Sequence, residues 1–137
     1  MIEAKELRIG NWIYDSEENN NFQVEEIKNI NGFHYTCYRK KSIKALRVEG
    51  LTLTEDILLK CGFQYCGDRE WIVKKILDNS EICFSLMEEF VTDNFGIYKA
   101  DDDMNNGGWF YPKKTLYLHQ VQNLYWCLCG EELEIKL

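Results

Sequence analysis

The sequence has one proline, two histidines and no apolar run long enough to cross a membrane. A membrane-spanning helix needs about 20 consecutive apolar residues, and no stretch approaches that length. The first residues include Glu3 and Glu6 and lack the apolar segment of a signal peptide. We therefore expect a cytoplasmic protein that does not bind membranes. No repeat, linker or low-complexity tract interrupts the chain, so we expect it to fold throughout.

The composition favours a self-sufficient hydrophobic core. The chain has 137 residues, of which 45% are hydrophobic and 14% aromatic. This is the usual size of one domain or of two very small domains that share a core. The six cysteines are expected to be free thiols, because a protein that stays in a reducing compartment rarely forms disulfides.

The net charge of -7 favours solubility. It also argues against broad, nonspecific binding to nucleic acids, which depends on the neutralisation of phosphates. An anionic partner would therefore have to use a local basic segment.

Residues 1–50 predict an SH3-like β-meander. Asn31 and Gly32 are typical of a two-residue type I′ turn, where both positions need positive φ. The apolar spacing changes after Val24, which indicates a bulge, and residues 15–21 predict an exposed acidic loop between strands. The strands expected in this segment are 7–9, 12–14, 22–30, 33–38 and 45–48.

Residues 51–137 predict a second subdomain of mixed helices and strands. A short connecting helix over 55–61 is expected between Thr54, an N-cap residue, and Gly62, a left-handed C-terminal residue. Apolar residues at helical spacing predict a second helix over 119–129. The expected strands are 71–77, 82–87, 90–99, 110–118 and, from alternation alone, 133–137.

Together these patterns predict an α+β protein. The N-terminal SH3-like subdomain, 1–50, is followed by the α+β subdomain, 51–137, and the two are expected to form one compact unit. In the second subdomain, consecutive predicted strands are joined by polar turns, which favours an antiparallel sheet. We expect the C-terminal helix to pack on that sheet.

Three blocks of the sequence resemble a family of small Bacteroidota proteins of uncharacterised activity, often encoded in prophages and conjugative elements. The blocks are Glu6–Ile13, Gly50–Phe63 and Leu118–Ile135, and the segment His119–Tyr125 is the most specific part. They span most of the chain, although Thr52 stands where the family pattern has proline. The resemblance implies a bacterial mobile-element context. It assigns no activity and no site residue.

No metal site or cofactor is expected. Structural zinc sites show paired C-x2-C or H-x3-H spacings, which this chain lacks. The cysteines at 127 and 129 also depart from the family pattern, which weakens a special role for them. The closest spacings of these residue types are His34 with Cys37, Cys61 with Cys66, and Cys127 with Cys129.

One acidic segment matches the first half of a calcium-binding EF-hand loop. Asp101, Asp103 and Asn105 occupy the first three ligand positions. However, Asn106 replaces the glycine of position six and Pro112 replaces the glutamate of position twelve. A solvated loop between strands is the better interpretation.

We expect no catalytic activity. Nucleophilic catalysis requires a base beside a serine or cysteine, and the sequence has neither a nucleophile-elbow nor a P-loop pattern. His119 lies at the start of a predicted helix, where a side chain can cap or pack.

Two segments remain as candidate binding surfaces. The first is basic, with five positive charges and no acid across nine residues, and aromatic residues precede it. It is a candidate for weak nucleic-acid binding by stacking and phosphate contact, or a Lys-rich loop that protects a sheet edge. The candidate nucleic-acid-binding residues are Tyr35, Arg39, Lys40, Lys41, Lys44 and Arg47.

The second segment is aromatic. Trp109, Phe110 and Tyr111 follow a short Asn-Gly-Gly stretch and are candidates for an exposed contact with a protein. Packing in the core is the alternative for most of the aromatic residues. The sequence thus favours a non-catalytic protein that binds an unidentified protein partner, with nucleic-acid binding by residues 39–47 as the second hypothesis.

Overall fold

The structure is a computed structural model of the whole chain. By its internal contacts, the chain divides into two compact units. Unit 1 contains Met1–Thr52 and Tyr117–Leu128, and unit 2 contains Leu53–Leu116 and Cys129–Leu137. The residues that the structure describes are 2, 4–39, 41–44, 47–68, 70–77, 80–88, 95–99, 108–110 and 117–137.

The architecture is α+β, as the sequence predicts. The sequence places the last helix with residues 51–137, on the second sheet. In the structure, the internal contacts group residues 117–128 with the N-terminal unit. The reason lies in polar side chains of this helix, which bind the backbone of the first loop.

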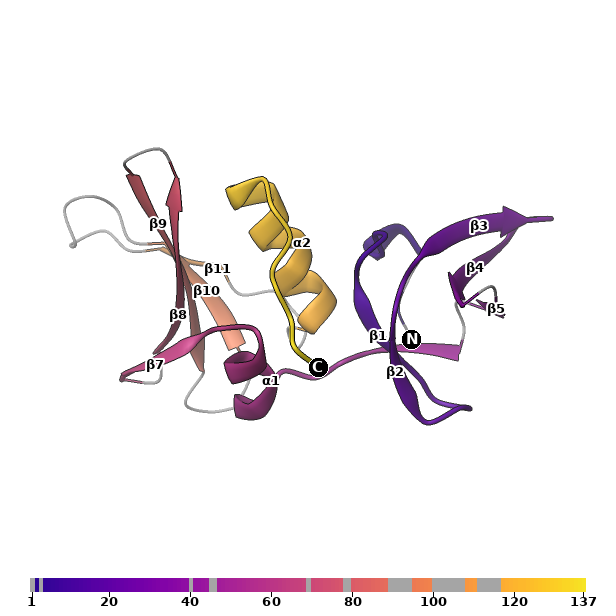
Figure 1. Cartoon of the computed structure of the whole chain (residues 1–137), viewed down its shortest axis with the longest axis horizontal. Helices are drawn as coiled ribbons and strands as arrows, with labels where there is room; N and C mark the ends of the chain where they lie inside the picture. Colours follow the sequence, from indigo (N-terminus) through magenta and orange to yellow (C-terminus); the bar gives the residue numbers. More distant parts are fainter. Residues whose placement is uncertain are drawn as a thin grey trace. The chain divides into compact units, whose positions relative to one another are not determined.

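Unit 1 contains two antiparallel three-stranded sheets, with strand orders β2-β1-β6 and β3-β4-β5 (Figure 1). Two residues separate β2 from β3, and the two strands belong to different sheets. The change of spacing after Val24 therefore marks a passage between sheets, whereas a bulge was predicted. The elements are the 3-10 helix η1 (Ala4–Glu6), β1 (Trp12–Asp15), β2 (Asn20–Gln23), β3 (Glu26–Ile30), β4 (Phe33–Tyr38), β5 (Lys41–Lys44), β6 (Val48–Gly50) and α2 (Leu118–Cys129).

The hairpin turns of unit 1 follow the local sequence signals. Asn31 and Gly32 both have positive φ, and Ile30 pairs with Phe33 directly across them. These observations confirm the two-residue turn. The acidic loop is also confirmed, because Asp15 of β1 pairs with Asn20 of β2 across it.

Two further strand predictions in unit 1 differ from the structure in the described residues. Residues 7–9 form no strand, because the chain turns at Gly10, where φ is 94°, and the Asn11 N–H bonds to the Arg8 carbonyl. Residues 41–44 form β5, although the basic segment gives little sign of a strand. The strand expected over 45–48 instead begins at Val48, and residues 45–46 lie outside the described part of the chain.

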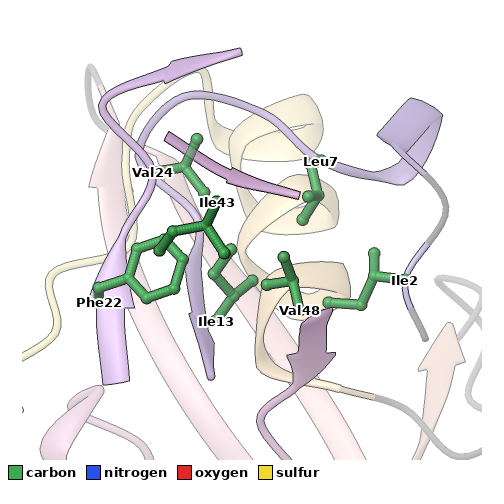
Figure 2. Packing of buried hydrophobic residues seen from close by; sticks show 7 residues of the cluster. All are labelled: Ile2, Leu7, Ile13, Phe22, Val24, Ile43 and Val48. Atoms are coloured by element: carbon green, nitrogen blue, oxygen red, sulfur yellow. The ribbon is translucent and has the colours of Figure 1, made fainter. Parts of the chain in front are cut away.

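The core of unit 1 lies between its two sheets. Phe22 and Ile13 come from one sheet and Ile43 from the other, and their side chains point toward one another (Figure 2). The Phe22 ring packs 5.5 Å from the ring of Tyr38, measured between centroids. Burial of each large apolar side chain contributes about 1.5–3 kcal/mol. The buried cluster contains Ile2, Leu7, Ile13, Phe22, Val24, Ile43 and Val48.

Helix α2 confirms the predicted helix within one residue and ends before Gly130, where φ is 70°. Val121 and Tyr125 of the predicted apolar stripe are buried, whereas Leu124 is partly exposed.

Unit 2 contains a short helix and one antiparallel sheet of order β11-β10-β9-β8-β7. The Thr54 hydroxyl accepts a hydrogen bond from the Ile57 N–H, which confirms the predicted N-cap. In the described residues the sheet has five strands: four correspond to those predicted between residues 71 and 118, and β7 joins the edge. Its elements are α1 (Glu55–Lys60), β7 (Gln64–Gly67), β8 (Glu70–Leu77), β9 (Ser80–Glu88), β10 (Phe95–Lys99) and β11 (Gly108–Phe110).

The alternating residues 133–137 form no strand. The Lys136 N–H instead bonds to the Lys60 carbonyl at the end of α1, at 3.1 Å. Alternation alone therefore misled the prediction, since a strand also needs a partner along its length.

Candidate functional site

Gln122 of α2 joins that helix to the loop that precedes β1. Its side-chain oxygen accepts a hydrogen bond from the Trp12 N–H at 2.8 Å, and its amide nitrogen donates to the Gly10 carbonyl at 3.0 Å. The Gln122 side chain is fully buried. A side-chain amide that both donates to and accepts from backbone groups replaces the bonds that a neighbouring strand would supply.

Asn123 makes a second set of bonds to the same loop. Its amide nitrogen donates to the Glu6 carbonyl at 2.8 Å, and its oxygen accepts from Arg8 Nε at 3.2 Å and Asn11 Nδ2 at 2.9 Å. The Arg8 guanidinium also lies 5.0 Å from the centre of the Trp126 ring. Gln122 and Asn123 therefore both join α2 to the loop before β1.

Gly50 lies against the ring of Tyr117, the residue that precedes α2. A Cβ atom at this position would lie 2.5 Å from Tyr117 Cγ, so only glycine fits here. The Leu118 N–H donates to the Leu51 carbonyl at 2.9 Å, and Thr52 forms a β-bridge with Tyr117. Residues 50–52 therefore contact Tyr117 and Leu118 within unit 1.

His119 is completely buried and stacks on the ring of Tyr117, with centroids 5.9 Å apart. Its two ring nitrogens have no hydrogen-bond partner, and Nε2 lies 3.7 Å from a carboxylate oxygen of Glu6, which is too long for a hydrogen bond. Burial lowers the pKa of His119, while the Glu6 carboxylate acts in the opposite direction. This histidine is therefore a neutral packing residue.

The structure pairs two of the basic-segment residues with acids. Arg47 contacts the carboxylates of Asp15 at 3.2 Å and Glu17 at 2.9 Å, and Lys41 contacts that of Glu18 at 2.5 Å. These contacts hold the acidic hairpin loop of unit 1 beside the basic segment. The positive charge of this segment is accordingly reduced.

Asp15 is a buried member of this network. Burial raises its pKa, but hydrogen bonds from the Glu17 and Glu18 N–H groups and the contact with Arg47 prevail, so that the pKa is lowered overall. A carboxylate with these partners remains ionised near neutral pH. Arg47 therefore has a structural role in closing the loop.

The other basic-segment residues lie in different surroundings. The Arg39 N–H donates to the Glu25 carboxylate at 2.9 Å, and its guanidinium lies 5.1 Å from the centre of the Tyr38 ring. Lys44 is exposed on β5, whereas Lys40 lies outside the described residues. Of the candidate nucleic-acid residues, the strand register brings Tyr35 and Lys44 side by side.

The register of the β3-β4-β5 sheet shows which residues lie on each of its two faces. Buried Thr36 pairs with Ile27 on one side and Ile43 on the other, and both of these side chains face the core. Because neighbouring residues of a strand point to opposite faces, Tyr35 and its two cross-strand partners, Lys28 and Lys44, lie on the opposite face. We call this the outer face.

The outer face ends in an apolar pair at the hairpin turn. Ile30 and Phe33 lie two residues closer to the turn than Lys28 and Tyr35, so they share the same face. Their side chains are 46% and 60% exposed, respectively. The candidate site is therefore the outer face, defined by Lys28, Ile30, Phe33, Tyr35 and Lys44.

The aromatic segment is described only in part. Trp109 and Phe110 belong to the edge strand β11 and pair with Tyr98 and Ile97 of β10. Tyr111 lies outside the described residues. A protein contact at these three residues stays a prediction.

Four cysteines lie in the described part of the chain with defined side chains, and all four are free thiols, as predicted: Cys61, Cys66, Cys127 and Cys129. Burial raises the pKa of Cys61 to about 12, so this thiol is not a nucleophile near neutral pH. Among the described residues, His, Cys, Asp and Glu form no group of three or more that is placed to hold a metal ion. No helix within these residues has both the length and the apolarity needed to cross a membrane.

Comparison with protein-family models, with curated proteins and with solved structures found no match.

Sequence reasoning missed several residues that the structure brings together. Lys28, Ile30 and Phe33 join the predicted Tyr35 and Lys44 only through the strand register. The Asn-Gly turn already fixes that register, so pairing outward from it was the signal that could have identified the outer face. Gln122 and Asn123 are adjacent amides on a predicted amphipathic helix. That pattern was the available signal that the helix binds backbone groups of another segment.

Proposed function

We propose that this protein is a non-catalytic accessory protein of a bacterial mobile element or prophage, and that it binds another protein in the cytoplasm. The genomic context rests on the three resembling blocks. Protein binding rests on the exposed pair Ile30 and Phe33. We further infer that unit 1 is an SH3-like barrel, which is supported by the passage of the chain from β2 in one sheet to β3 in the other.

The exposed pair favours a binding surface for two reasons. Scattered exposed apolar residues are ordinary. These two, however, are directly opposite one another, and Tyr35 is the next residue on the same face of β4. The hairpin that holds them is fixed by a two-residue turn and five residue pairs. A preordered surface loses little conformational entropy when a partner covers it.

Nucleic-acid binding by residues 39–47 is the alternative, and the structure gives it less support. Lys41 and Arg47 already contact carboxylates, so fewer positive charges of the segment remain for phosphates. The aromatic segment at residues 109–111 is a second candidate surface for a protein partner.

Site-specific photocrosslinking in the bacterial host tests the proposal. A benzophenone amino acid at position 33 is expected to link the chain to one recurrent protein. The matched control places it at Tyr65, which is also an exposed aromatic residue of a strand, but in unit 2. Identical products at both positions, or no product at position 33, would contradict the proposal. The genes beside the coding sequence test the mobile-element context separately.

A further inference from the structure

We infer that the outer face binds an acidic segment of the partner protein, and that this segment supplies a large apolar side chain to the hairpin tip. The inference rests on the proposed function and adds the chemistry of the partner. It depends on the two kinds of side chain that the sheet register brings together.

The first kind is apolar. Ile30 and Phe33 form a cross-strand pair beside the turn, and both are among the large apolar residues exposed in unit 1. One side chain of the partner protein can therefore contact an aliphatic and an aromatic surface at the same time. Aromatic residues are enriched among those that dominate binding energy at protein interfaces.

The second kind is cationic. Tyr35 lies on the central strand, with Lys28 as its partner on β3 and Lys44 as its partner on β5. A lysine therefore lies beside Tyr35 on each neighbouring strand. Carboxylates that flank an apolar side chain of the partner would meet the amino groups of these two lysines.

Lys28 also contacts the Glu26 carboxylate at 3.0 Å, and both side chains are about half exposed. Ion pairs of this kind are weak and exchange readily with other partners. Lys44 is therefore expected to contribute more than Lys28 to the attraction of an acidic segment.

An acidic peptide fits these charges better than a nucleic acid. A nucleic acid needs a continuous row of cations along its phosphates, whereas the outer face presents two lysines and also Glu26. The net charge of -7 also repels a polyanion more strongly than a peptide with a few carboxylates.

Selection from a phage-displayed library of short random peptides tests this inference. The purified wild-type chain is the target, and the Phe33→Ser variant in solution removes peptides that bind elsewhere. The enriched peptides are expected to share an aromatic or large aliphatic residue beside Asp or Glu. Their binding is then measured by fluorescence anisotropy, with oligothymidylate as the nucleic-acid probe.

Two charge-reversal variants give the matched comparison. Lys44→Glu is expected to weaken binding of the enriched peptides by about tenfold. Lys136→Glu changes the net charge equally at an exposed position of unit 2 and is expected to leave binding unchanged. Raising the ionic strength from about 0.01 M to about 0.15 M should weaken wild-type binding, because it shortens the screening length from about 30 Å to about 8 Å.

The possible outcomes separate this inference from the proposed function. Enriched peptides without acidic residues, or equal effects of the two lysine variants, overturn the acidic chemistry but leave a protein-binding surface in place. Failure to enrich any peptide also counts against the inference, while crosslinking at position 33 judges protein binding independently. Tighter binding of oligothymidylate than of the peptides would replace the inference with nucleic-acid binding.

Discussion

The side-chain oxygen of Gln122 accepts a hydrogen bond from the backbone N–H of Trp12, at 2.8 Å. This bond ties α2 to the start of β1, although 110 residues separate the two positions in the chain. It explains why a helix from the end of the sequence belongs to the N-terminal unit.

Replacement of Gln122 by leucine should destabilise unit 1. Leucine keeps a similar volume but leaves the Trp12 N–H without this acceptor, whereas the Gly10 carbonyl retains a bond from Gln23. An unsatisfied buried donor costs about 1–3 kcal/mol, and the free energy of unfolding should fall by that amount. Urea unfolding followed by tryptophan fluorescence measures the change.

The control for Gln122→Leu is the same substitution at Gln64, which is exposed on β7. An exposed position should change the free energy of unfolding by less than about 0.5 kcal/mol. Equal effects at the two positions would show that the buried amide contributes nothing specific.

The sequence predicted the elements whose limits are set by neighbouring residues. Thr54, Gly62 and Gly130 are local caps, and Asn31-Gly32 is a local turn, so these limits agree with the structure. Strand β5 was missed because only Ile43 among its four residues is buried, and the strand is at the edge of its sheet. An edge strand with three exposed polar residues has almost no hydrophobic pattern.

The candidate site was predicted less well than the fold. Tyr35 and Lys44 were identified, but Lys41 and Arg47 were grouped with them although their acidic partners lie 23 and 32 residues away in the chain. Such long-range pairs follow from the packing of hairpins and cannot be inferred from local spacing. The same limit applies to Lys28, which joins Tyr35 only across the sheet.

The burial of His119 should make stability depend on pH. Its pKa in the folded protein lies below the value of about 6.5 expected in the unfolded chain. As the pH falls below about 6.5, the unfolded chain binds a proton that the folded chain does not, so the free energy of unfolding decreases. This contribution is fully present above about pH 6.5 and is lost progressively below it.

Unfolding measurements between about pH 7.5 and pH 5.5 check this expectation. His119→Phe removes the titrating group from the core and should flatten the decrease in the free energy of unfolding. His34→Phe, at the other histidine, which is exposed, is the matched control for the loss of an imidazole. An unchanged profile in His119→Phe would rule out this histidine as the source of the acid sensitivity.

The close approach of Gly50 to Tyr117 predicts a strongly coupled pair of positions. Gly50→Ala places a methyl group 2.5 Å from the Tyr117 ring, and overpacking of this kind typically costs about 1–3 kcal/mol. In the Tyr117→Ala background the obstructing ring is absent, so the added methyl group should cost much less. A double-mutant cycle measured by urea unfolding gives the coupling energy. Additive effects of the two substitutions would contradict the contact.

Phe33 should contribute to binding without contributing to folding. Its side chain is largely exposed at the hairpin tip, so Phe33→Ser should change the free energy of unfolding by less than about 0.5 kcal/mol. Ile13 lies in the core cluster, and Ile13→Ala should lower the free energy of unfolding by about 2–5 kcal/mol. Urea unfolding of both variants, with peptide binding measured on the Phe33 variant, distinguishes the two roles. A large loss of stability in Phe33→Ser would mean that this residue supports the fold, and the outer face would then lose its main argument as a binding surface.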